Sequence, residues 1–591
     1  MDVLIYGADS ETIDGQPLSL QFFSKDVKDC EHIVFVDHKS SQKQFFKFLG
    51  KLQRECLHVF YVHNLDFDLP EFLWRSKTKL VENGSGEFKF KSGPWNVSGV
   101  YGKPTFCKLV NKQRKATVMF VDSFSWYQGS LANAAELFCP NLPKLKAPPH
   151  LGSIKYTAKD QAFVKYAMRD AEVCYYIGKA IQKIHTQFDI PQAVSLADMA
   201  ARIFRRKFLD YTIPQPGAAV VAAALKSYHG GKNHVRTGAK GAWHEHTYAY
   251  DISSAYPFAM TRLPSMRYKN LYKRYAKKVG TPARRIKRVP ELGVYQVSGE
   301  ALPCEYPCLF SHAFKPLQGK FTNVWIHGLE VNEALRAKEL KIKSIRGHYY
   351  EAEKDKDPSA FQEFVDHFYK LKQTEREPVM RHMYKITLNA VYGKFIQTRK
   401  STQVSYTDVD SGETIETQEL VAGGMFHPFI ASFITAHCRV YIHRAEHQYK
   451  AIHTATDGII SYQKTLRPVP GYPKRGLGAL ECEGKDETLL LVRNKCYIRY
   501  SRRKPKGAKK PIKSTAFKGQ YIIKYALHGF QGKVYTLETL VMRNRRKYFV
   551  ERPNRLKESI NRGLRVNRFE RREYTLKVPP IAVARRGQKT A

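Results

Sequence analysis

The sequence has little acidic charge and no long apolar run. It carries 54 Asp and Glu against 98 Lys and Arg, which gives a formal net charge of +44 over 591 residues. The basic excess is spread along the chain, and a distributed positive field favours a polyanionic partner, most simply nucleic acid. No stretch is apolar enough to span a bilayer, and no signal peptide is visible. These absences predict a cytoplasmic protein that does not bind membranes; a basic soluble protein without a nucleic-acid partner is the alternative.

The ten cysteines form no recognisable framework. Cys304 and Cys308 lie close together, but without a second pair they do not predict a zinc site. Reduced thiols in a cytosol fit the scatter better. The length and the 43% hydrophobic content predict several folded domains, and no internal repeat is evident.

The stretch 248–257 reads as a buried strand that ends on a lone carboxylate. Aromatic and small residues flank Asp251, and a Ser-Ser-Ala-Tyr-Pro turn follows it. Burying a carboxylate beside apolar surface costs free energy unless something binds it, and a metal ion is one such partner. Capping of the next helix is the alternative. This stretch alone leaves both interpretations open.

A first acidic cluster is expected near the amino terminus. Residues 2–8 and 17–23 are predicted to be paired strands around the turn Asp14-Gly15. If the first strand continues, Asp9 and Glu11 project from one face and repel each other unless a cation lies between them. A solvated strand end is the alternative.

Two further acidic sites follow regular elements. The apolar strand 59–62 runs into Asn64 and Asp68, and a helix is expected to start near Thr157, where Thr157-Ala-Lys-Asp160 has capping-box character. Tyr166 and Asp170 share a face of that helix because they are four residues apart. Such carboxylates could converge on two Mg²⁺ ions about 3.5–4 Å apart, which activate water and stabilise the leaving oxygen of a phosphodiester.

In this order and spacing the three sites resemble the motifs of the proofreading 3′–5′ exonuclease domain of DNA polymerases. The motifs are Asp9-x-Glu11, Asn64-x-x-Phe67-Asp68 and Tyr166-x-x-x-Asp170. The resemblance implies four metal ligands, namely Asp9, Glu11, Asp68 and Asp170, and a water-orienting Tyr166. It implies that single-stranded DNA is held by Tyr61, His63, Asn64 and Phe67, with Lys146 as an auxiliary lysine. A further Ser-Leu motif has two placements, Ser123-Phe124 and Ser130-Leu131.

The carboxyl-terminal half holds a helical face of unusual composition. Arg381, Lys385, Asn389 and Tyr392 are spaced four, four and three residues apart, so they lie on one side of a helix that Pro378 would begin. Two cations, an amide and a phenol suit a triphosphate and a base. A solvated basic stripe beside a core tyrosine is the alternative.

Two short turns complete the pattern. Gly230 and Gly231 permit close backbone approach to a phosphate backbone, although an ordinary turn would also use them. Residues 452–460 read as strand, tight turn and strand around Asp457-Gly458.

These stretches resemble the polymerase motifs of the family B DNA polymerases. The matching sequences are Tyr228-His-Gly230-Gly231, Asp251-Ile252-Ser-Ser-Ala255-Tyr256-Pro257, Lys385-x-x-x-Asn389-Ala390-Val-Tyr392-Gly393, Ala455-Thr456-Asp457 and Lys495-Cys-Tyr497. Three positions depart from the family pattern: Ala255 replaces Leu, Ala390 replaces Ser, and Ala455 replaces the first Asp of Asp-Thr-Asp.

The resemblance implies a role for each matching residue. Metal would be held by Asp251, by Asp457 and by the backbone carbonyl of Ile252, and Asp251 and Asp457 would be the catalytic pair. The incoming nucleotide would contact Tyr256, Arg381, Lys385 and Tyr392. DNA would contact Tyr228, Gly230, Gly231, Asn389, Gly393, Lys495 and Tyr497.

The spacing of the motifs is similar to that of the protein-primed family B polymerases of phages and linear plasmids, which carry two insertions. The implied fold is a multidomain α/β and α+β chain in which a ribonuclease-H-like exonuclease precedes a right-hand polymerase. The predicted domains are 1–190 exonuclease, 191–262 palm, 263–356 terminal-protein-binding insertion, 357–397 fingers, 398–428 second insertion, 429–530 palm and 531–591 thumb. The second insertion is predicted to be a hairpin with strands at 402–407 and 414–420. The thumb is predicted to be folded, with a disordered basic tail as the alternative.

The resemblance implies a DNA-directed DNA polymerase with a 3′–5′ exonuclease that replicates a linear phage or plasmid genome in the host cytoplasm by strand displacement. Expected partners are primer–template DNA, deoxynucleoside triphosphates and a separate terminal protein that primes a monomeric enzyme, with two Mg²⁺ per site, which Mn²⁺ could replace. The alternatives are an exonuclease with a decayed polymerase site, which Ala455 favours, and a primer-independent family B polymerase. A DNA-binding scaffold without chemistry gives no reason for carboxylates to recur at motif spacing.

Overall fold

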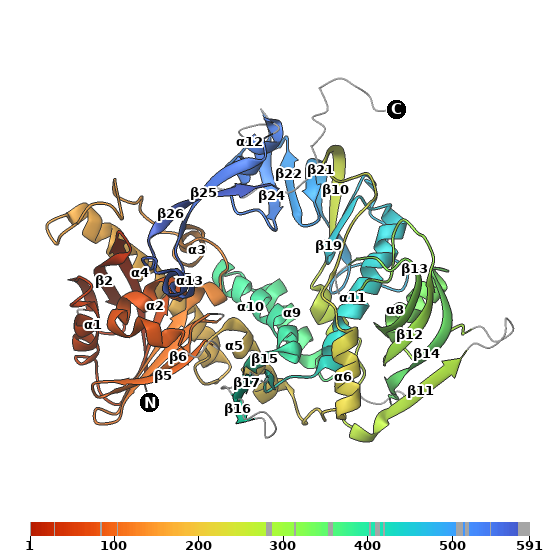
Figure 1. Cartoon of the computed structure of the whole chain (residues 1–591), viewed down its shortest axis with the longest axis horizontal. Coiled ribbons are helices and arrows are strands. Elements are labelled where there is room, and N and C mark those ends of the chain that lie inside the picture. Colours follow the sequence, from red (N-terminus) through yellow and green to blue (C-terminus); the bar gives the residue numbers. More distant parts are fainter. Residues whose placement is uncertain are drawn as a thin grey trace. The chain divides into compact units, whose positions relative to one another are not determined.

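The computed structural model describes most of the chain and divides it into two compact units (Figure 1). The described residues are 2–28, 30–82, 86–102, 104–278, 286–311, 315–352, 358–400, 404–407, 414–417, 420–503, 512–514, 519–543 and 545–576. The first unit comprises Met1–Phe208, His367–Met425 and Glu551–Arg571, and the second comprises Leu209–Asp366, Phe426–Val550 and Arg572–Ala591.

An eight-stranded sheet with the order β3-β2-β1-β4-β8-β7-β6-β5 forms the centre of the first unit. Its strands are β1 Val3–Ile13, β2 Gln16–Ser24, β3 Cys30–Phe35, β4 Leu57–Val62, β5 Glu87–Ser92, β6 Trp95–Val100, β7 Phe106–Asn111 and β8 Ala116–Asp122. β1, β4 and β8 are parallel, and the other neighbours are antiparallel. The five strands β3-β2-β1-β4-β8 have the ribonuclease-H-like arrangement expected from the sequence.

The predicted amino-terminal hairpin is confirmed, and its first strand is longer than expected. Asp14 and Gly15 both have positive φ, 49° and 71°, as a tight turn between twisted strands requires. β1 continues to Ile13, so Asp9 and Glu11 lie on a regular strand. β4 pairs with β1 only from Val3 to Gly7, so Asp9 and Glu11 lie beyond the end of that parallel pairing and are paired with β2 alone.

The helices of the first unit are α1 Ser41–Leu49, α2 Leu65–Phe72, α3 Leu131–Phe138, α4 Gln161–Gln187, α5 Leu196–Ile203, α10 Pro378–Ala390 and α13 Leu556–Arg562, with most of α9 Gln362–Thr374. α4 packs across β1 and β2. The prediction that this helix starts near Thr157 was wrong. The carboxylate of Asp160 accepts hydrogen bonds from the amide and the hydroxyl of Thr157, at 2.7 and 2.9 Å, so residues 157–160 close a turn and the helix begins at Gln161.

Gly7 allows α4 to lie directly on β1. A Cβ atom at position 7 would stand 1.8 Å from the carbonyl oxygen of Ala171 and 2.5 Å from the amide nitrogen of Tyr175. Both atoms belong to the α4 backbone and cannot move aside as a flexible side chain could. Glycine at this position therefore brings α4, and with it Asp170, against the strand that carries Asp9.

A second eight-stranded sheet, antiparallel throughout, forms the centre of the second unit in the order β23-β24-β22-β21-β10-β20-β19-β9. Its strands are β9 Lys232–Val235, β10 Ala242–Ile252, β19 His453–Thr456, β20 Gly458–Ser461, β21 Leu480–Arg493, β22 Cys496–Ser501, β23 Ile512–Lys513 and β24 Tyr521–Leu527. α11 Pro428–Tyr449 packs against β9, β19 and β20, and also contacts α6 Ala218–Ser227 and α7 Ala255–Thr261. The predicted strand, turn and strand at 452–460 are confirmed as β19 and β20.

A smaller sheet within the second unit has its own core. Its strands are β11 Tyr272–Lys278, β14 Leu340–Tyr350, β12 Gly293–Ala301 and β13 Gly319–His327, in that spatial order, with α8 Gly328–Arg336 packed on it (Figure 1). Tyr295, Val297 and Val331 are completely buried in this core. The sheet falls inside the stretch 263–356 that the sequence assigns to an insertion.

The remaining elements agree with several local predictions. α9 and α10 form the predicted helices around a turn, with Pro378 in the first turn of α10. β16 Val404–Thr407 pairs antiparallel with β17 Thr414–Thr417, as the predicted hairpin requires, and its turn at 408–413 lies outside the described residues. The short strands β15 Thr398–Lys400 and β18 Leu420–Ala422 pair beside it.

The carboxyl-terminal segment is folded as far as residue 576. α12 Val534–Met542, β25 Lys547–Pro553, α13 and β26 Phe569–Thr575 follow one another. Phe530, Leu537 and Tyr548 belong to a core that β22 also lines, so the alternative of a disordered basic tail is wrong for this part. The thumb predicted for 531–591 is split, because 551–571 cluster with the first unit, where Leu556 and Val566 enter its core. Residues 577–591 lie outside the described residues.

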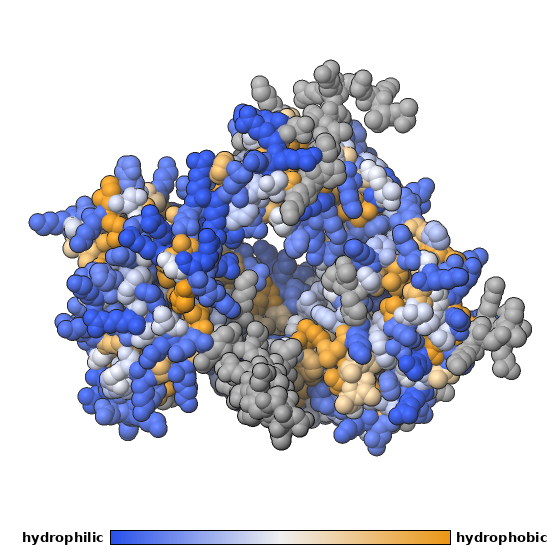
Figure 2. Space-filling view, viewed as in Figure 1, coloured by the Kyte–Doolittle hydropathy of each residue, from blue (hydrophilic) through white to orange (hydrophobic). Residues whose placement is uncertain are grey.

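The visible surface is predominantly hydrophilic, with scattered apolar residues (Figure 2), as the excess of Lys and Arg leads one to expect. Among the described residues, none of the helices combines the length and the apolar character that crossing a bilayer demands.

Asn567 is expected to stabilise the first unit more than its charged neighbours do. It has a φ of 58°, and its buried side-chain amide donates to the Phe67 carbonyl and to the buried carboxylate of Glu71, at 2.9 and 2.6 Å. Asn567→Ala should lower the free energy of unfolding by about 2–4 kcal/mol, because it removes the amide donor of a buried carboxylate and puts alanine in a left-handed conformation. Chemical denaturation of the full chain measures this cost.

Arg568→Ala is the matched control. Arg568 pairs with Asp14 at 3.1 Å, but both side chains are about half exposed. Its loss should cost roughly 0–1 kcal/mol. Equal costs for the two variants would contradict this account of the contact.

Candidate metal centres and their surroundings

Three of the four predicted exonuclease carboxylates come together at one point. β1 supplies Asp9 and Glu11, and α4 supplies Asp170. One ligand oxygen from each lies within 4.8 Å of the other two. The packing of α4 on Gly7 therefore assembles a set of oxygen donors of the kind that Mg²⁺ prefers.

Asp68 stands directly beside this set. It lies in the first turn of α2, it is 2% exposed, and it accepts hydrogen bonds from the amide and the hydroxyl of Ser10 at 2.9 and 2.7 Å. Its charge is close enough to raise the pKa of Asp9. Asp68 is outside the group of three mutually close oxygens, so its role as a fourth ligand stays a prediction.

The electrostatic environment of the Asp9, Glu11 and Asp170 carboxylates favours a bound cation. Burial first, and then the neighbouring carboxylates, raise the pKa of Asp9 well above its usual range. Burial also raises the pKa of Glu11 to about 8, with Asp170 adding to the shift. One oxygen of Asp170 is buried without a hydrogen-bond partner. Groups of this kind fit a divalent metal, which would bind the lone pairs that they cannot share with one another.

The lysine in this cluster is Lys144, not the predicted Lys146. The ammonium of Lys144 forms an ion pair with Asp170 and lies 5.3 Å from the centre of the Tyr166 ring. Burial lowers the pKa of Lys144, but the nearby Asp170 outweighs it and the net shift is upward. Lys146 is exposed. The two lysines are only two residues apart, so the folded chain and not the sequence spacing decides which of them reaches the carboxylates.

The residues predicted to hold single-stranded DNA differ in their exposure. Tyr61 is completely buried and its hydroxyl accepts from Gln192, so it exposes no surface for the predicted contact with single-stranded DNA. Asn64 is exposed in a left-handed conformation and Phe67 is partly exposed. Their contacts with DNA stay predictions.

Side-chain contacts distinguish the two placements of the Ser-Leu motif. The ring of His63 lies between the Ser123 hydroxyl at 3.1 Å and the Gly129 carbonyl at 2.9 Å. Ser130 instead caps α3 through the amide of Asn133. Ser123 is thus the serine that contacts a predicted DNA-binding residue.

Asp251 and Asp457 are brought together by the pairing of β10 with β20. Asp251 lies opposite Gly458, and the amide of Ile252 donates to the carbonyl of Asp457 at 2.9 Å. A Cβ atom at position 458 would stand 2.8 Å from Oδ1 of Asp251. Gly458 therefore leaves space for the carboxylate at the tip of the hairpin.

Gly230 and Gly231 lie directly beside this hairpin, because the strand that follows them, β9, pairs with β19. A Cβ atom on Gly231 would stand 2.6 Å from Cγ2 of Thr456 and 2.8 Å from its Cα, and Thr456 has a φ of 61°. The guanidinium of Arg439 donates to the carbonyls of His229 and Gly230, at 2.6 and 2.9 Å. The close approach at Gly231 is thus to the protein's own chain, whereas the sequence argument assigned it to the DNA backbone.

Charged groups that the sequence did not single out surround Asp457. Burial raises the pKa of Asp457, Glu483 adds to the shift, and Lys524 and Lys495 oppose it. Lys524 donates to Glu483 at 2.8 Å. Neither residue stands in a recognisable motif, so only the pairing of β24 and β21 with the rest of the sheet reveals them.

The Lys-x-Tyr motif is divided between surface and core. Lys495 occupies the turn between β21 and β22 with a φ of 54°, near Asp457. Tyr497 is 8% exposed and its ring packs on His453 with the centroids 5.3 Å apart. Tyr497 is thus mostly buried, and its contact with the primer stays a prediction.

The basic helical face lies on α10 in the first unit. Arg381 and Lys385 are exposed, and the Asn389 amide donates to the Lys385 carbonyl at 2.9 Å. The opposite face of α10 is buried. Tyr392 lies beyond the end of α10, in the 3₁₀ helix Tyr392–Ile396, so the predicted face holds for three of its four members.

Comparison with known proteins identifies the family. The sequence model of the family "DNA polymerase type B, organellar and viral" matches residues 153–461. The chain belongs to this family. It is therefore a DNA-directed DNA polymerase of type B, an enzyme class that uses divalent metal ions.

Solved structures share its fold over nearly the whole length. Phi29 DNA polymerase in an orthorhombic crystal form is 16% identical, with a TM-score of 0.69, and the match covers 97% of this chain and 100% of that one. The same coverage and identity, with a TM-score of 0.68, hold for phi29 DNA polymerase complexed with primer-template DNA and incoming nucleotide substrates, and for its complex with single-stranded DNA. The predicted fold class is thereby confirmed. No curated protein sequence matches the chain.

Glu11→Gln should stabilise the metal-free protein, and increasingly so as the pH rises. The folded-state pKa of Glu11 is about 8 against an ordinary value of 4.5, so the wild type loses stability as the pH rises from about 5 to 8. Glutamine does not titrate. In a chelator the variant should gain on the order of 1–3 kcal/mol at pH 8 and much less at pH 5, as measured by thermal or chemical unfolding.

The control for this effect is Glu55→Gln, because Glu55 is exposed and pairs with Lys115. Because it retains Glu11, Glu55→Gln should lose stability with rising pH as the wild type does, and only Glu11→Gln should differ. Mg²⁺ or Mn²⁺ should stabilise the wild type more than Glu11→Gln. An equal pH slope in all three proteins would contradict the picture of a repelling cluster.

Gly231→Ala should impair synthesis and leave the exonuclease unaffected. Its Cβ would push Thr456, and Asp457 follows directly in the chain. A displacement of about 1 Å can lower a catalysed rate on the order of 100-fold. Gly217→Ala, where a Cβ meets nothing within 4 Å, is the control, and steady-state extension rates compare the two.

Proposed function

We propose that this chain is a protein-primed, strand-displacing replicative polymerase with 3′–5′ proofreading, which copies a linear phage or plasmid genome in the host cytoplasm. The observation that carries the proposal is the presence of two separate carboxylate centres, one in each compact unit. Asp9, Glu11 and Asp170 form one, and Asp251 and Asp457 form the other. A polymerase that corrects its own errors uses two such centres, because extension joins the primer hydroxyl to a nucleoside triphosphate whereas editing cleaves the last phosphodiester with water.

In the synthetic centre, the primer 3′ hydroxyl attacks the α-phosphate of a deoxynucleoside triphosphate, the bond to the β-phosphate breaks, and pyrophosphate leaves. Two Mg²⁺ ions, which Mn²⁺ could replace, would supply activation of the hydroxyl and charge neutralisation there. Asp251, Asp457 and the carbonyl of Ile252 would hold them. Tyr256 would lie under the incoming sugar and exclude a 2′ hydroxyl.

Cationic side chains would stabilise the charge of the triphosphate. Arg381 and Lys385 point to solvent from α10 and are suited to phosphate oxygens, and Tyr392 would pack against the nascent pair. Lys495 and Lys524 already counter the negative charge near Asp457. The primer–template would contact Tyr228, Gly230, Asn389, Gly393 and Lys495.

In the editing centre, water attacks the last phosphodiester of a frayed 3′ end. Asp9, Glu11, Asp170 and Asp68 would hold the metal pair, and the Tyr166 hydroxyl would orient the water. Lys144 contacts both Asp170 and the Tyr166 ring, so we include it in this centre. His63, Asn64 and Phe67 would hold the single strand.

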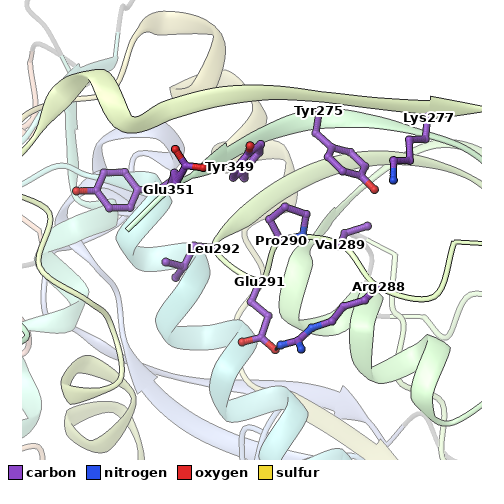
Figure 3. A pocket seen from close by; sticks show the side chains of 10 residues that line it. Tyr275, Lys277, Arg288, Val289, Pro290, Glu291, Leu292, Tyr349 and Glu351 are labelled. Atoms are coloured by element: carbon purple, nitrogen blue, oxygen red, sulfur yellow. Dashed lines mark hydrogen bonds and ion pairs between the residues drawn. The ribbon is translucent and has the colours of Figure 1, made fainter. Parts of the chain in front are cut away.

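The small sheet of the second unit is proposed to bind a separate terminal protein, whose side-chain hydroxyl replaces the primer at initiation on a monomeric enzyme. A pocket of about 620 Å³ opens on this sheet, lined by β11, the segment 288–292 and β14. Figure 3 shows Tyr275 and Tyr349 on one side of it, and Arg288 and Glu291 facing each other as an ion pair. Such a mixture of aromatic and charged groups suits a protein surface.

A second candidate is an exonuclease whose synthetic centre has decayed. Ala455 favours it, because this position pairs with Gly458 beside the catalytic hairpin and lacks the carboxylate that the family commonly carries there. Primer-independent initiation is a further variant of the first proposal, and adding or withholding the terminal protein would distinguish the two.

A primer–template assay with Mg²⁺, resolved on a gel, tests the proposal. Without nucleotides the primer should shorten, and with nucleotides it should lengthen. Asp457→Ala should abolish extension and leave shortening intact, whereas Asp9→Ala should do the reverse. Shortening without any extension by the wild type would contradict a functional synthetic centre and establish the second candidate.

A further inference from the structure

A cluster of nitrogen and oxygen donors lies on α11, away from both catalytic centres. His443 and His447 are one helical turn apart on this helix, and Glu339 approaches them from the loop between α8 and β14. Their ring Nε2 atoms are 3.1 Å apart, and Oε1 of Glu339 lies 2.9 Å from Nε2 of His443 and 3.3 Å from Nε2 of His447. The three atoms form a nearly equilateral triangle.

Protons alone cannot satisfy this triangle. An ionised carboxylate oxygen only accepts, so both ring nitrogens would have to donate to it. The two nitrogens would then face each other as two donors at 3.1 Å. If instead one nitrogen is unprotonated, its lone pair faces the carboxylate oxygen. Every distribution of protons over the rings leaves one of the three contacts repulsive.

A cation that accepts all three lone pairs removes the conflict. Zn²⁺ binds His nitrogen and carboxylate oxygen at about 2.0–2.2 Å in tetrahedral geometry, which places neighbouring ligand atoms about 3.3 Å apart. The three observed separations are 2.9, 3.1 and 3.3 Å. The triangle thus has nearly the dimensions of one face of a zinc tetrahedron.

The outer partners of these residues hold them in ligating orientations. Nδ1 of His443 is 3.0 Å from Oε1 of Glu333. When Nδ1 carries the ring proton it donates to that carboxylate, and the lone pair of Nε2 is available to a metal. The other oxygen of Glu339, Oε2, accepts from the Cys308 amide at 2.8 Å. A carboxylate behind a histidine and a fixed carboxylate are the usual supports of metal ligands.

Cys304 stands near this group and is the candidate for a fourth donor. It is an exposed cysteine without a disulfide in the segment after β12, and burial first, then the nearby carboxylate of Glu339, raise the pKa of its thiol. The spacing of the cysteines alone predicts no zinc site. The histidines of His443-x-x-x-His447 are nitrogen donors from another element, α11, which the cysteine pattern does not reveal.

We propose that Glu339, His443, His447 and Cys304 bind one Zn²⁺ ion that joins the small sheet of the second unit to the long helix α11. Glu339 and Cys304 come from the small sheet and its connections, and both histidines come from α11. His447 is 44% exposed, so the ion can enter from solvent.

The site is structural and not hydrolytic. Glu446 lies on the same helix between the two histidines, where a general base could stand, but it is completely buried. It forms an ion pair with Lys232 and contacts His234 at 3.4 Å. With Glu446 engaged in this way and four protein ligands on the ion, neither a base nor an open coordination position is available.

Metal analysis of the full chain tests the proposal directly. The protein is purified without a histidine tag, exposed to equimolar Zn²⁺ in millimolar Mg²⁺ to occupy the catalytic centres, and freed of excess metal. The wild type should retain one zinc per chain, and His447→Gln should retain none. His246→Gln, which removes an exposed histidine elsewhere, should bind as the wild type does.

Spectroscopy and stability separate this proposal from a purely ionic cluster. Co²⁺ in place of Zn²⁺ should give intense tetrahedral d–d bands and a thiolate charge-transfer band, and Cys304→Ser should lose the latter. Zn²⁺ should raise the Tm of the wild type but not that of His447→Gln, whose unfolding in chelator should match the wild type. Equal zinc content in the wild type and His447→Gln, or no effect of Zn²⁺ on the wild-type Tm, would overturn the proposal.

Discussion

Repulsion among buried carboxylates is the constraint on which the proposed editing centre depends. Asp9, Glu11 and Asp170 are held together by strand and helix packing, and Lys144 is the cation that pairs with Asp170. The close contact of α4 with β1 that Gly7 permits keeps these carboxylates together. A bound metal relieves the repulsion, so metal affinity is built into the fold before any substrate arrives.

The second unit shows the opposite case, in which buried acidic residues have lowered pKa values. Burial works to raise the pKa of Glu330, but the guanidinium of Arg439 outweighs it and the pKa falls below its ordinary value. Lys232 does the same for Glu446. Arg439 donates both to Glu330 and to the carbonyls of His229 and Gly230 beside the Asp457 hairpin, through bonds of 2.6 to 2.9 Å. Glu330 and Glu446, which have cationic partners, are thus kept ionised inside the fold, whereas Asp9 and Glu11 in the proposed editing centre have raised pKa values.

The sequence predicted the features that depend on local chemistry. The position of Asp9 and Glu11 on one strand, the hairpin at Asp457 and the helix begun by Pro378 follow from period, turn residues and the fixed φ of proline. What could not be predicted depends on long-range packing. Lys144 and Lys146 are equivalent in sequence, and only the path of the chain before α4 selects one of them.

The burial of individual motif side chains could not be predicted from the sequence either. Tyr61 and Tyr497 occupy motif positions with aromatic side chains, yet both are in cores, because a strand residue faces the interior or the solvent according to a register that the motif does not specify. The histidines of α11 were overlooked for a related reason. Their partners Glu339 and Cys304 are more than a hundred residues away in sequence.

Anomalous X-ray scattering from crystals of the full chain grown with Mn²⁺ would test the central claim most directly. The account predicts peaks at two places, between Asp9, Glu11 and Asp170, and between Asp251 and Asp457. The first should disappear in Glu11→Gln and the second in Asp457→Ala. A peak at the first place alone, in crystals that hold primer–template and nucleotide, would contradict the claim that this chain carries two working metal centres.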